Sequence, residues 1–580
     1  MEERKILTRR SFLAKSVIAS GGIILSSHIV ACVRDFEGDA DAPDSVPRFL
    51  HGVGSFDPTA NAVIIWTRFT PIETEVSESI RIRWQVAEDE GFSAIVKEGT
   101  EIASMINDFT IAKDVTRLPS KGKFYYRFLQ EELNETSVVG ETITLPNSGD
   151  VVDSVKLAVC SCSNYPAGLF NVYDAMANSE ADVIVHLGDY IYEYEEGGFG
   201  TNENTVPLGR VHDPSTEILS LEDYRLRYRQ YRSDEALQLA HQKKPFIAVW
   251  DDHELTNDAY IDGAENHDSS EGSFQARRQR AVQVYNEYMP FRSNSSEIIY
   301  RNFEFGNLVN LVMLDTRIIA RDQQLSFNDF FTAAGFDFAA FETALLNPER
   351  NLLGPTQLSW ARNAVAGSSA QWQVLGQQVL TGRMFVPAEL LIAIGTVASG
   401  NATAETFAQL QQTIIELSTL KARSLQGDPT LTPTELARIN TVVPYNLDAW
   451  DGYPIERERL FATLNGKNVI TLAGDTHNAW NTELKDAAGN RIGEEFACPS
   501  VSSPGFEGLF GNDPATIAGI EQAFVLLIDD LQYFDAARRG YVLAEFTSGT
   551  ASGSYRFVDT LASTSYSVTE QHNAVVSVSV

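Results

Sequence analysis

The stretch Val183-Ile184-Val185-His186-Leu187-Gly188-Asp189-Tyr190-Ile191-Tyr192-Glu193 decides the fold class of this 580-residue chain. Its run Val183–Leu187 predicts a strand that is buried on both faces of a sheet. Gly188 allows the backbone to turn sharply where the strand ends, and Asp189 follows at once. A buried strand that ends in polar side chains is typical of an α/β protein with a ligand site at the edge of its sheet.

The same pattern occurs four more times after residue 155. Strands are predicted at Val155–Val159, Phe246–Trp250, Leu308–Leu314 and Val469–Ala473. Helical segments such as Leu221–Tyr231 and Gln275–Tyr288 alternate with them, which predicts a layered α/β architecture. The polar residues that follow these strands include Cys162, Asp252, His253, Asn257, Arg317, Asp475 and His477. Five such strand ends predict one shared site rather than unrelated polar residues at the surface.

The side chains at these strand ends are of the types that bind metal ions. Anionic oxygen, thiolate, phenolate and neutral imidazole form a mixed ligand set that suits a hard or borderline cation. Two cations a few ångströms apart could hold a hydroxide and stabilise an in-line displacement at phosphorus. A lone histidine is more often structural, but the carboxylates beside His253 and His477 favour a functional interpretation.

Composition and length narrow the class of protein. The hydrophobic content of 43% predicts packed cores, and 580 residues predict more than one of them. The formal net charge is -33. We expect no nucleic-acid-binding surface, because binding to phosphate backbones needs clustered Lys and Arg. Beyond residue 32 the chain has three cysteines, Cys160, Cys162 and Cys498, and an odd number does not indicate a disulfide framework.

The first 32 residues are predicted to be an export signal of a bacterial protein. Thr8-Arg9-Arg10-Ser11-Phe12-Leu13-Ala14-Lys15 matches the twin-arginine pattern, so the export machinery of that pathway is an expected partner. The apolar run Val17–Val30 is interrupted by glycine and serine and is a poor membrane span. Ile29-Val30-Ala31-Cys32 resembles a lipobox, and a lipid anchor at Cys32 and ordinary cleavage nearby both remain open. We expect a periplasmic, cell-surface or extracellular protein.

The remaining chain is predicted to have two parts joined to the signal by a linker at 33–47. Short β-rich runs such as Ile80–Val86 predict an N-terminal β-sandwich over 48–145. The α/β domain is expected over 150–570, with a helical insertion at about 386–445. A capping box at Thr432-Pro433-Thr434-Glu435 marks a helix within that insertion. The insertion is interpreted as a surface elaboration or as a lid over the site.

Several motifs, taken as an ordered set, resemble those of PhoD-type alkaline phosphatases. The resemblance covers nearly all of the chain after the signal. The motifs are Ser161-Cys162-Ser163-Asn164-Tyr165, Gly188–Glu193, Trp250-Asp251-Asp252-His253-Glu254, Leu314-Asp315-Thr316-Arg317, Trp450-Asp451-Gly452-Tyr453-Pro454 and Gly474-Asp475-Thr476-His477.

The resemblance implies a layered α/β/β/α metallophosphoesterase core of the calcineurin type, related to purple acid phosphatases. This core would lie behind a fibronectin- or Ig-like N-terminal sandwich. An iron(III)–calcium centre is also implied. By that analogy Asp189 bridges the metals, and the iron shell is completed by Cys162, Tyr192 and His477. Calcium is assigned to Asp252 and Asp475, with Asn257 serving a further calcium.

The activity implied is hydrolysis of small-molecule phosphate esters by a metal-bound hydroxide. His253 is placed to protonate the leaving alkoxide, with a structural histidine as the alternative. Arg210 and Arg317 are candidate phosphate clamps, and for each a plain salt bridge is an equal alternative. Monoesters and diesters are both open as substrates. The competing function is a catalytically silent cation- or glycan-binding surface protein that reuses the fold. A dinuclear amide hydrolase is disfavoured, because more histidine ligands would be expected.

Overall fold

The computed structural model describes residues 48–333, 335–398, 403–507 and 513–578. The predicted export signal, Cys32 and the linker lie outside these ranges. Among the helices within them, none combines the length and the apolar character that crossing a bilayer requires.

Two large sheets form the centre of the protein. The first has nine strands, in the order β25 (Val568–Ser577), β24 (Thr550–Val558), β23 (Arg539–Thr547), β9 (Ser154–Cys160), β10 (Val183–His186), β11 (Phe246–Ala248), β1 (Val53–Phe56), β2 (Ala62–Arg68) and β5 (Thr110–Thr116). The second has seven, in the order β12 (Arg301–Phe305), β13 (Val309–Met313), β16 (Trp372–Gly376), β19 (Asn468–Ala473), β21 (Arg491–Ala497), β20 (Ala479–Lys485) and β22 (Leu531–Asp535).

The central strands of the seven-stranded sheet are buried on both faces. In β13, Leu311 and Met313 belong to the hydrophobic core shared with the nine-stranded sheet, whereas Val312 belongs to the core on the opposite face. Successive side chains of a strand point to opposite faces, so a largely apolar strand serves both cores. Helices α7 (Gly354–Gly367) and α11 (Pro454–Leu464) contribute to the outer core. The predicted α/β/β/α layering is thereby confirmed.

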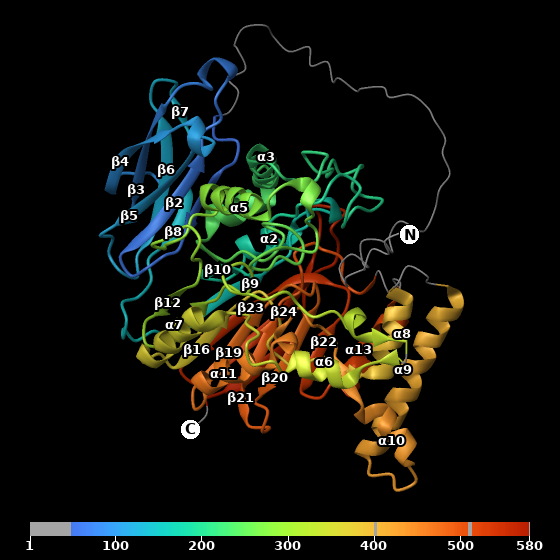
Figure 1. Ribbon diagram of the computed structural model, residues 1–580. Helices are drawn as coiled ribbons and strands as arrows, with labels where there is room; N and C mark the ends of the chain where they lie inside the picture. The colour runs from blue at the N-terminus through green and yellow to red at the C-terminus, as the bar shows by residue number, and fades with distance from the viewer. Residues whose placement is uncertain (1–47, 334, 399–402, 508–512, 579–580) are drawn as a thin grey trace, which may run out of the picture.

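The outer face of the nine-stranded sheet is also covered by helices. Helix α2 (Asn171–Ala177) contacts β23, and α4 (Glu235–Lys243) contacts β1. Helices α3 (Leu221–Arg232) and α5 (Phe274–Tyr288) pack against each other nearby (Figure 1). The latter two helices agree with the helical segments predicted from the sequence.

Parallel strands at the centre of each sheet end at one edge. In the first sheet β9 pairs in parallel with β10, and β10 with β11. In the second sheet β13, β16 and β19 pair in parallel. All five strands predicted from the apolar runs are present, within two residues at each end. Their carboxyl ends carry the predicted site, which is where sheets of this kind bind ligands.

The N-terminal region shares a sheet with the α/β core. Its other sheet consists of β3 (Ile80–Ala87), β4 (Ile95–Ala103), β6 (Lys123–Gln130), β7 (Glu135–Thr136) and β8 (Gly140–Ile143). That sheet packs on the face of β2 and β5 through residues such as Ile82, Phe128, Val63 and Ile65. The strands β1, β2 and β5 continue the core sheet, because Phe56 of β1 pairs with Phe246 of β11. Apolar alternation predicts strands but not which sheet they join.

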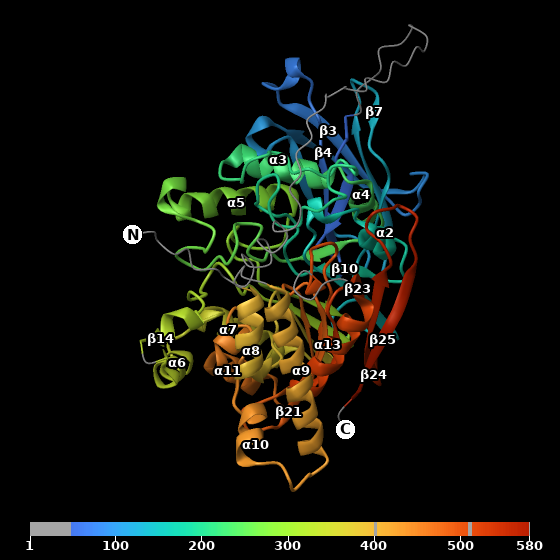
Figure 2. The ribbon, with the colours of Figure 1, turned by 90° about the vertical axis from the view of Figure 1, so that its right-hand side faces the viewer.

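The predicted insertion begins and ends on a pair of short strands. Strand β17 (Phe385–Pro387) pairs antiparallel with β18 (Val442–Pro444), and between them lie α8 (Ala388–Ala398), α9 (Ala404–Leu425) and α10 (Pro433–Asn440). The capping box forms as expected, since the Glu435 amide donates to Thr432 Oγ1 and the Thr432 amide donates to the Glu435 carboxylate. Helix α9 packs beside α13 (Pro514–Leu527), and the three insertion helices project from one side of the molecule (Figures 1 and 2).

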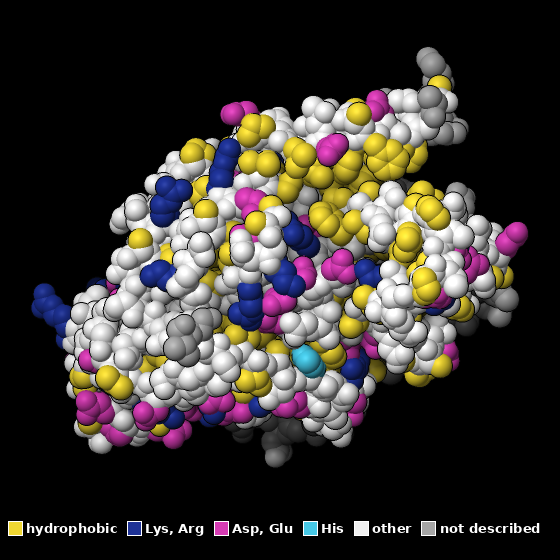
Figure 3. All heavy atoms as spheres, turned by 90° about the horizontal axis from the view of Figure 1, so that it is seen from below, with side chains coloured by type: hydrophobic (Ala, Val, Ile, Leu, Met, Phe, Trp, Pro, Cys, Tyr) yellow, Lys and Arg dark blue, Asp and Glu magenta, His cyan; other side chains and the backbone are white. Residues whose placement is uncertain are grey.

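A small phenylalanine-rich unit follows the end of β13. It comprises the 3₁₀ helix η5 (Phe327–Phe330), strands β14 (Phe331–Thr332) and β15 (Gly335–Phe336), and α6 (Phe338–Leu345). Its aromatic rings contact one another, and Phe331 and Phe338 remain largely exposed. Seen from below, hydrophobic side chains gather in a hollow of the surface (Figure 3).

Asp57 and Arg301 form a buried ion pair that joins the two large sheets. The carboxylate follows β1, and the guanidinium belongs to β12; Arg301 Nε and Nη2 lie 2.6 and 2.7 Å from the two oxygens of Asp57. Asp57 also accepts a hydrogen bond from the Arg292 amide. Breaking one side of such a pair leaves an uncompensated buried charge.

We expect Arg301→Met to lower the free energy of unfolding by about 3–5 kcal/mol. The double variant Asp57→Asn/Arg301→Met should recover much of that loss, because Asn tolerates the positive φ of 45° at this position and carries no charge. Urea denaturation of the wild type, both single variants and the double variant measures the coupling. A loss below about 1 kcal/mol for Arg301→Met would contradict the assignment.

Candidate metal centre

Four of the predicted metal ligands have a left-handed backbone. The φ angles are 63° at Cys162, 56° at Asp189, 67° at Asp475 and 63° at His477. Residues with a Cβ atom rarely adopt this region, and where they do the surrounding structure must enforce it. All four follow the ends of β9, β10 or β19. The backbone is therefore held in a costly conformation at the points from which these side chains reach a common centre.

The first group of potential ligands comprises Cys162, Asp189 and His477, whose ligand atoms lie within 4.8 Å of one another. Tyr192 completes the group: its hydroxyl lies 3.2 Å from Asp189 Oδ2 and 3.1 Å from His477 Nε2. The Cys162 thiol lies 3.4 Å from the same Asp189 oxygen. All four side chains are buried. The structure thus brings together the residues expected on the iron side of the centre.

The protonation of His477 suits a metal ligand. Its Nδ1 atom lies 2.9 Å from the carbonyl oxygen of Pro504. A carbonyl only accepts hydrogen bonds, so the proton resides on Nδ1. In the neutral ring the lone pair is then on Nε2, which faces Tyr192. A metal-binding histidine is commonly held in its tautomer by such a bond at the other nitrogen.

A second group of carboxylates adjoins the first. Oxygens of Asp251, Asp252 and Asp475 lie within 4.8 Å of one another, and Asp189 forms a further group with Asp252 and His253. Burial, opposed by Arg317 and reinforced by the neighbouring aspartates, raises the pKa of Asp251 well above its usual range. Asp189 thus lies in the first group and adjoins Asp252 of the second, where a bridging ligand would lie. Asp251 was not predicted as a ligand.

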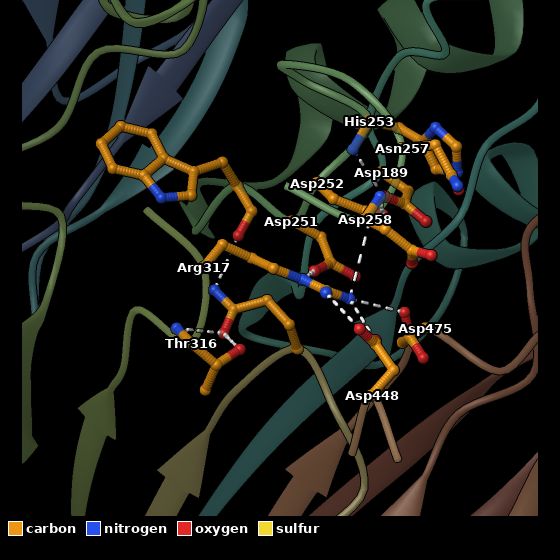
Figure 4. A network of polar contacts seen from close by, with 12 residues as sticks. Asp189, Asp251, Asp252, His253, Asn257, Asp258, Thr316, Arg317, Asp448 and Asp475 are labelled. Carbon is orange, nitrogen blue, oxygen red and sulfur yellow. Dashed lines mark hydrogen bonds and ion pairs between the residues drawn. The ribbon is translucent and has the colours of Figure 1, made fainter. Parts of the chain in front are cut away.

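Arg317 is the cation that the structure places among these carboxylates (Figure 4). Its guanidinium contacts Asp251, lies 2.9 Å from Asp475 and from Asp448, and lies 3.7 Å from Asp252. Arg317 is fully buried. Arg317, which was predicted to be either a phosphate clamp or a salt-bridge residue, therefore lies at the site and makes salt bridges there.

Arg210 lies in a different environment. Its guanidinium pairs with Asp234 at 2.6 Å and stacks on the rings of Tyr165 and Phe170. It also donates to the carbonyl of Tyr165. These contacts correspond to the salt-bridge alternative, and they tie the segment after β9 to the start of α4.

The arrangement of donors fits bound cations. Asp189, Asp251, Asp252 and Asp475 are all buried, and Arg317 supplies one positive charge among them. Among the described residues, Asp251 Oδ2 and Asn257 Oδ1 are buried oxygens with no hydrogen-bond partner. Buried carboxylates need counter-charges, and buried oxygen acceptors need donors or cations. Cations at these oxygens would satisfy both needs.

His253 forms a buried pair with Glu193, its Nδ1 lying 2.6 Å from the carboxylate. Burial opposes protonation of the ring, but the charges of Glu193, Asp189 and Asp252 outweigh it and raise the pKa of His253 to about 9. Burial likewise opposes ionisation of Glu193, yet His253 lowers the pKa of that carboxyl to about 2. Within the described part of the chain, His253 Nε2 is buried without a hydrogen-bond partner. The ring is an oriented acid with one N–H uncommitted.

The loop that carries Asp189 has every peptide group paired from residue 188 to residue 190. Glu254 accepts hydrogen bonds from the amides of Asp189 and Tyr190, and it also accepts from Asp251. The Gly188 and Asp189 carbonyls accept from the amides of Cys162 and Ser163. The remaining two groups, the Gly188 amide and the Tyr190 carbonyl, bond to His186 Nδ1 and Ser163 Oγ. Gly188 has φ 104°, and a Cβ there would lie 2.4 Å from the Asp251 nitrogen.

Several residues of the centre were missed by the sequence analysis. Glu193 and Glu254 lie inside the motifs that were quoted, and their position beside predicted ligands was the available signal. Asp448 and Ser503 gave no such signal, because they come from segments remote in sequence. Ser503 Oγ lies 2.6 Å from the Tyr192 hydroxyl and donates to the Cys162 carbonyl.

Comparison with known proteins agrees with this geometry. A family model described as PhoD-like phosphatase matches residues 157–555, and one described as PhoD-like phosphatase, N-terminal domain, matches residues 36–146. Alkaline phosphatase D of Bacillus subtilis (strain 168) is 34% identical over 502 residues, which are 83% of this chain and 74% of that protein. The solved structure of PhoD aligns with a TM-score of 0.72 at 30% identity, covering 93% of this chain and 92% of that one. The chain therefore belongs to the PhoD-like phosphatase family of phosphoric ester hydrolases.

Proposed function

We propose that this protein is an exported, metal-dependent phosphoesterase that hydrolyses phosphomonoesters, phosphodiesters or both. The observation that carries the proposal is the pair of adjoining buried ligand groups, Cys162/Asp189/His477 and Asp251/Asp252/Asp475, which Asp189 links because it also groups with Asp252. Two cations bridged by one carboxylate are the arrangement used for in-line displacement at phosphorus. The proposed location is the periplasm, the cell surface or the medium. It rests on the twin-arginine pattern at residues 8–15, and a lipid anchor at Cys32 is one form it could take.

The two ligand groups differ in chemistry, and this supports iron(III) and calcium as the cations. Iron(III) would be held by the thiolate, phenolate and imidazole of Cys162, Tyr192 and His477 together with Asp189. Calcium prefers oxygen ligands, which Asp252 and Asp475 supply, with Asn257 available for a further calcium. When bound, such cations supply Lewis acidity that activates water and neutralises phosphate oxygens.

The role proposed for His253 follows from its two ring nitrogens. Glu193 holds Nδ1–H and fixes the orientation of the ring, while Nε2–H is left to protonate a leaving alkoxide. Arg317 is the stronger of the two predicted phosphate clamps, because it lies among the carboxylates of the centre. Its Nε and Nη1 atoms are held by Asp251 and Asp448, which would orient Nη2, the donor to Asp475, toward a phosphate at the same edge.

The first test is metal analysis of the purified full-length protein, followed by turnover of a monoester and a diester. We expect both iron and calcium by elemental analysis, a visible band from tyrosinate bound to iron, and hydrolysis of 4-nitrophenyl phosphate, bis(4-nitrophenyl) phosphate or both. Chelation should abolish turnover, and re-addition of the metals should restore it. A protein that binds cations but hydrolyses neither ester would support the silent binding function instead.

The second test compares two buried cysteines two residues apart. Cys162→Ala should lose iron and the visible band and lower kcat by about 100-fold or more, since it removes a proposed ligand. Cys160→Ala is the matched control, because Cys160 is equally buried but belongs to the hydrophobic core between the sheets. It should retain metal and activity and lose only the stability of a small cavity. Full activity and colour in Cys162→Ala would remove this residue from the site.

The third test uses the pH dependence set by Glu193. A general acid must be protonated, so turnover is expected to fall as pH rises through the pKa of His253, which is about 9. Glu193→Gln removes the carboxylate that stabilises the imidazolium, lowers that pKa and moves the alkaline limb of the kcat profile to lower pH. The shift should be larger for an alkyl phosphate than for 4-nitrophenyl phosphate, whose leaving group needs little protonation. An unmoved alkaline limb for the alkyl ester would exclude His253 as the proton donor.

A further inference from the structure

We propose that Tyr173, His186 and Ser163 form a hydrogen-bonded chain that positions Asp189, and that these three are positioning residues for the metal centre. The proposal rests on the phosphoesterase function proposed above and adds residues to which no role has been assigned. All three are buried beneath the loop after β10. His186 is a lone histidine in a buried strand, with no neighbouring carboxylate in the sequence to suggest a functional role.

The direction of every hydrogen bond in the chain follows from its first link. The Gly188 amide donates to His186 Nδ1 at 3.2 Å, so this nitrogen carries a lone pair. Burial lowers the pKa of His186 to about 3, and the ring is neutral. Its proton must then be on Nε2, which lies 2.8 Å from the Tyr173 hydroxyl. Tyr173 accepts that proton's hydrogen bond and therefore donates its own.

The chain ends on the far side of Asp189. The Tyr173 hydroxyl donates to Ser163 Oγ at 2.9 Å, and Ser163 in turn donates to the Tyr190 carbonyl at 2.9 Å. The chain thus starts at the peptide amide before Asp189 and ends at the peptide carbonyl after it. Each hydroxyl accepts one bond and donates its single proton; that of Ser163 is nearest the Tyr190 carbonyl at 2.9 Å, and the Asp189 carbonyl lies farther away at 3.3 Å.

The hydrogen bonds of this chain stabilise the left-handed backbone of Asp189, whose φ is 56°. Glu254 accepts from the amides of Asp189 and Tyr190, whereas the Gly188 amide and the Tyr190 carbonyl bond to the two ends of the chain. If the chain were broken, the strained conformation would be less strongly favoured. The bridging carboxylate would then sample other positions. Loss of a residue that orients metal ligands typically costs about 10- to 100-fold in metal affinity or activity.

Tyr173→Phe breaks the chain by removing one hydroxyl, and Tyr228→Phe is the matched control. Both tyrosines are fully buried in the same core cluster, and among the described residues the Tyr228 hydroxyl has no hydrogen-bond partner. We expect Tyr173→Phe to lower kcat by about 10- to 100-fold with KM changed less than twofold, and to release its metals faster during dialysis against EDTA. Tyr228→Phe should match the wild type in both measurements.

A second comparison tests whether the residues act as one unit. Ser163→Ala and the double variant Tyr173→Phe/Ser163→Ala should each release metal about as fast as Tyr173→Phe. Either substitution alone already interrupts the hydrogen-bonded chain, so the second should add no further effect. If Tyr173→Phe fails to fold, Ser163→Ala against Tyr228→Phe gives the same test.

Two results would overturn the proposal: metal release from Tyr173→Phe that equals that from Tyr228→Phe, or multiplicative effects in the double variant. Metal release is measured without substrate. A wild type that retains metal but has no esterase activity would therefore refute the proposed function and still leave the positioning chain testable.

Discussion

The centre of this protein depends on the conformation of three consecutive residues, Gly188, Asp189 and Tyr190. Asp189 has a left-handed backbone, and the three residues have each amide and each carbonyl hydrogen-bonded. The partners come from β10 itself, from the segment after β9 and from the segment after β11. Because Asp189 belongs to the first ligand group and also groups with Asp252 of the second, an error in its position would displace the whole centre. The strain is thus balanced by bonds from neighbouring strand ends, as is common at functional sites.

Charge is the second constraint on the centre. Four buried aspartates surround one buried guanidinium, Arg317, and they exceed it in charge even though burial raises the pKa of Asp251. In a low-dielectric interior such an excess is costly unless cations balance it, so the donor arrangement itself favours metal binding. Asp448 extends this network to Arg321, and it follows the strand that closes the helical insertion. The insertion therefore ends beside the centre, although its helices project away from it (Figures 1 and 4).

Much of the fold could be predicted from the sequence because its strands are buried on both faces. Val309–Met313 and Asn468–Ala473 are mostly apolar, with Asn310 and Thr471 as buried polar exceptions, and such runs are a strong local signal. The placement of β1, β2 and β5 in the core sheet could not be predicted, since the β1–β11 pairing joins residues 56 and 246 through a single parallel contact. Similarly, the residues next to an arginine in the sequence do not indicate which carboxylate it will pair with. From the sequence, Arg210 and Arg317 were equal candidates for a phosphate clamp or a salt bridge. Only the tertiary contacts distinguish them, because Arg210 pairs with Asp234 and Arg317 pairs with the aspartates of the site.

The sequence by itself determined the chemistry of the centre: which strands end in carboxylate, thiolate, phenolate and imidazole, and which residues carry them. Those are local properties, because strand burial and the residues that follow each strand are adjacent in the chain. Tertiary structure decided everything that depends on distance between strand ends. It placed Cys162, Tyr192 and His477 around Asp189, and it brought Asp251 and Asp448 to the same centre. It also placed Glu193, Glu254 and His186 where they hold His253 and the loop of Asp189 by hydrogen bonds. Two sheets that place their parallel strand ends at one edge create these neighbours, and no local pattern encodes which ends will meet.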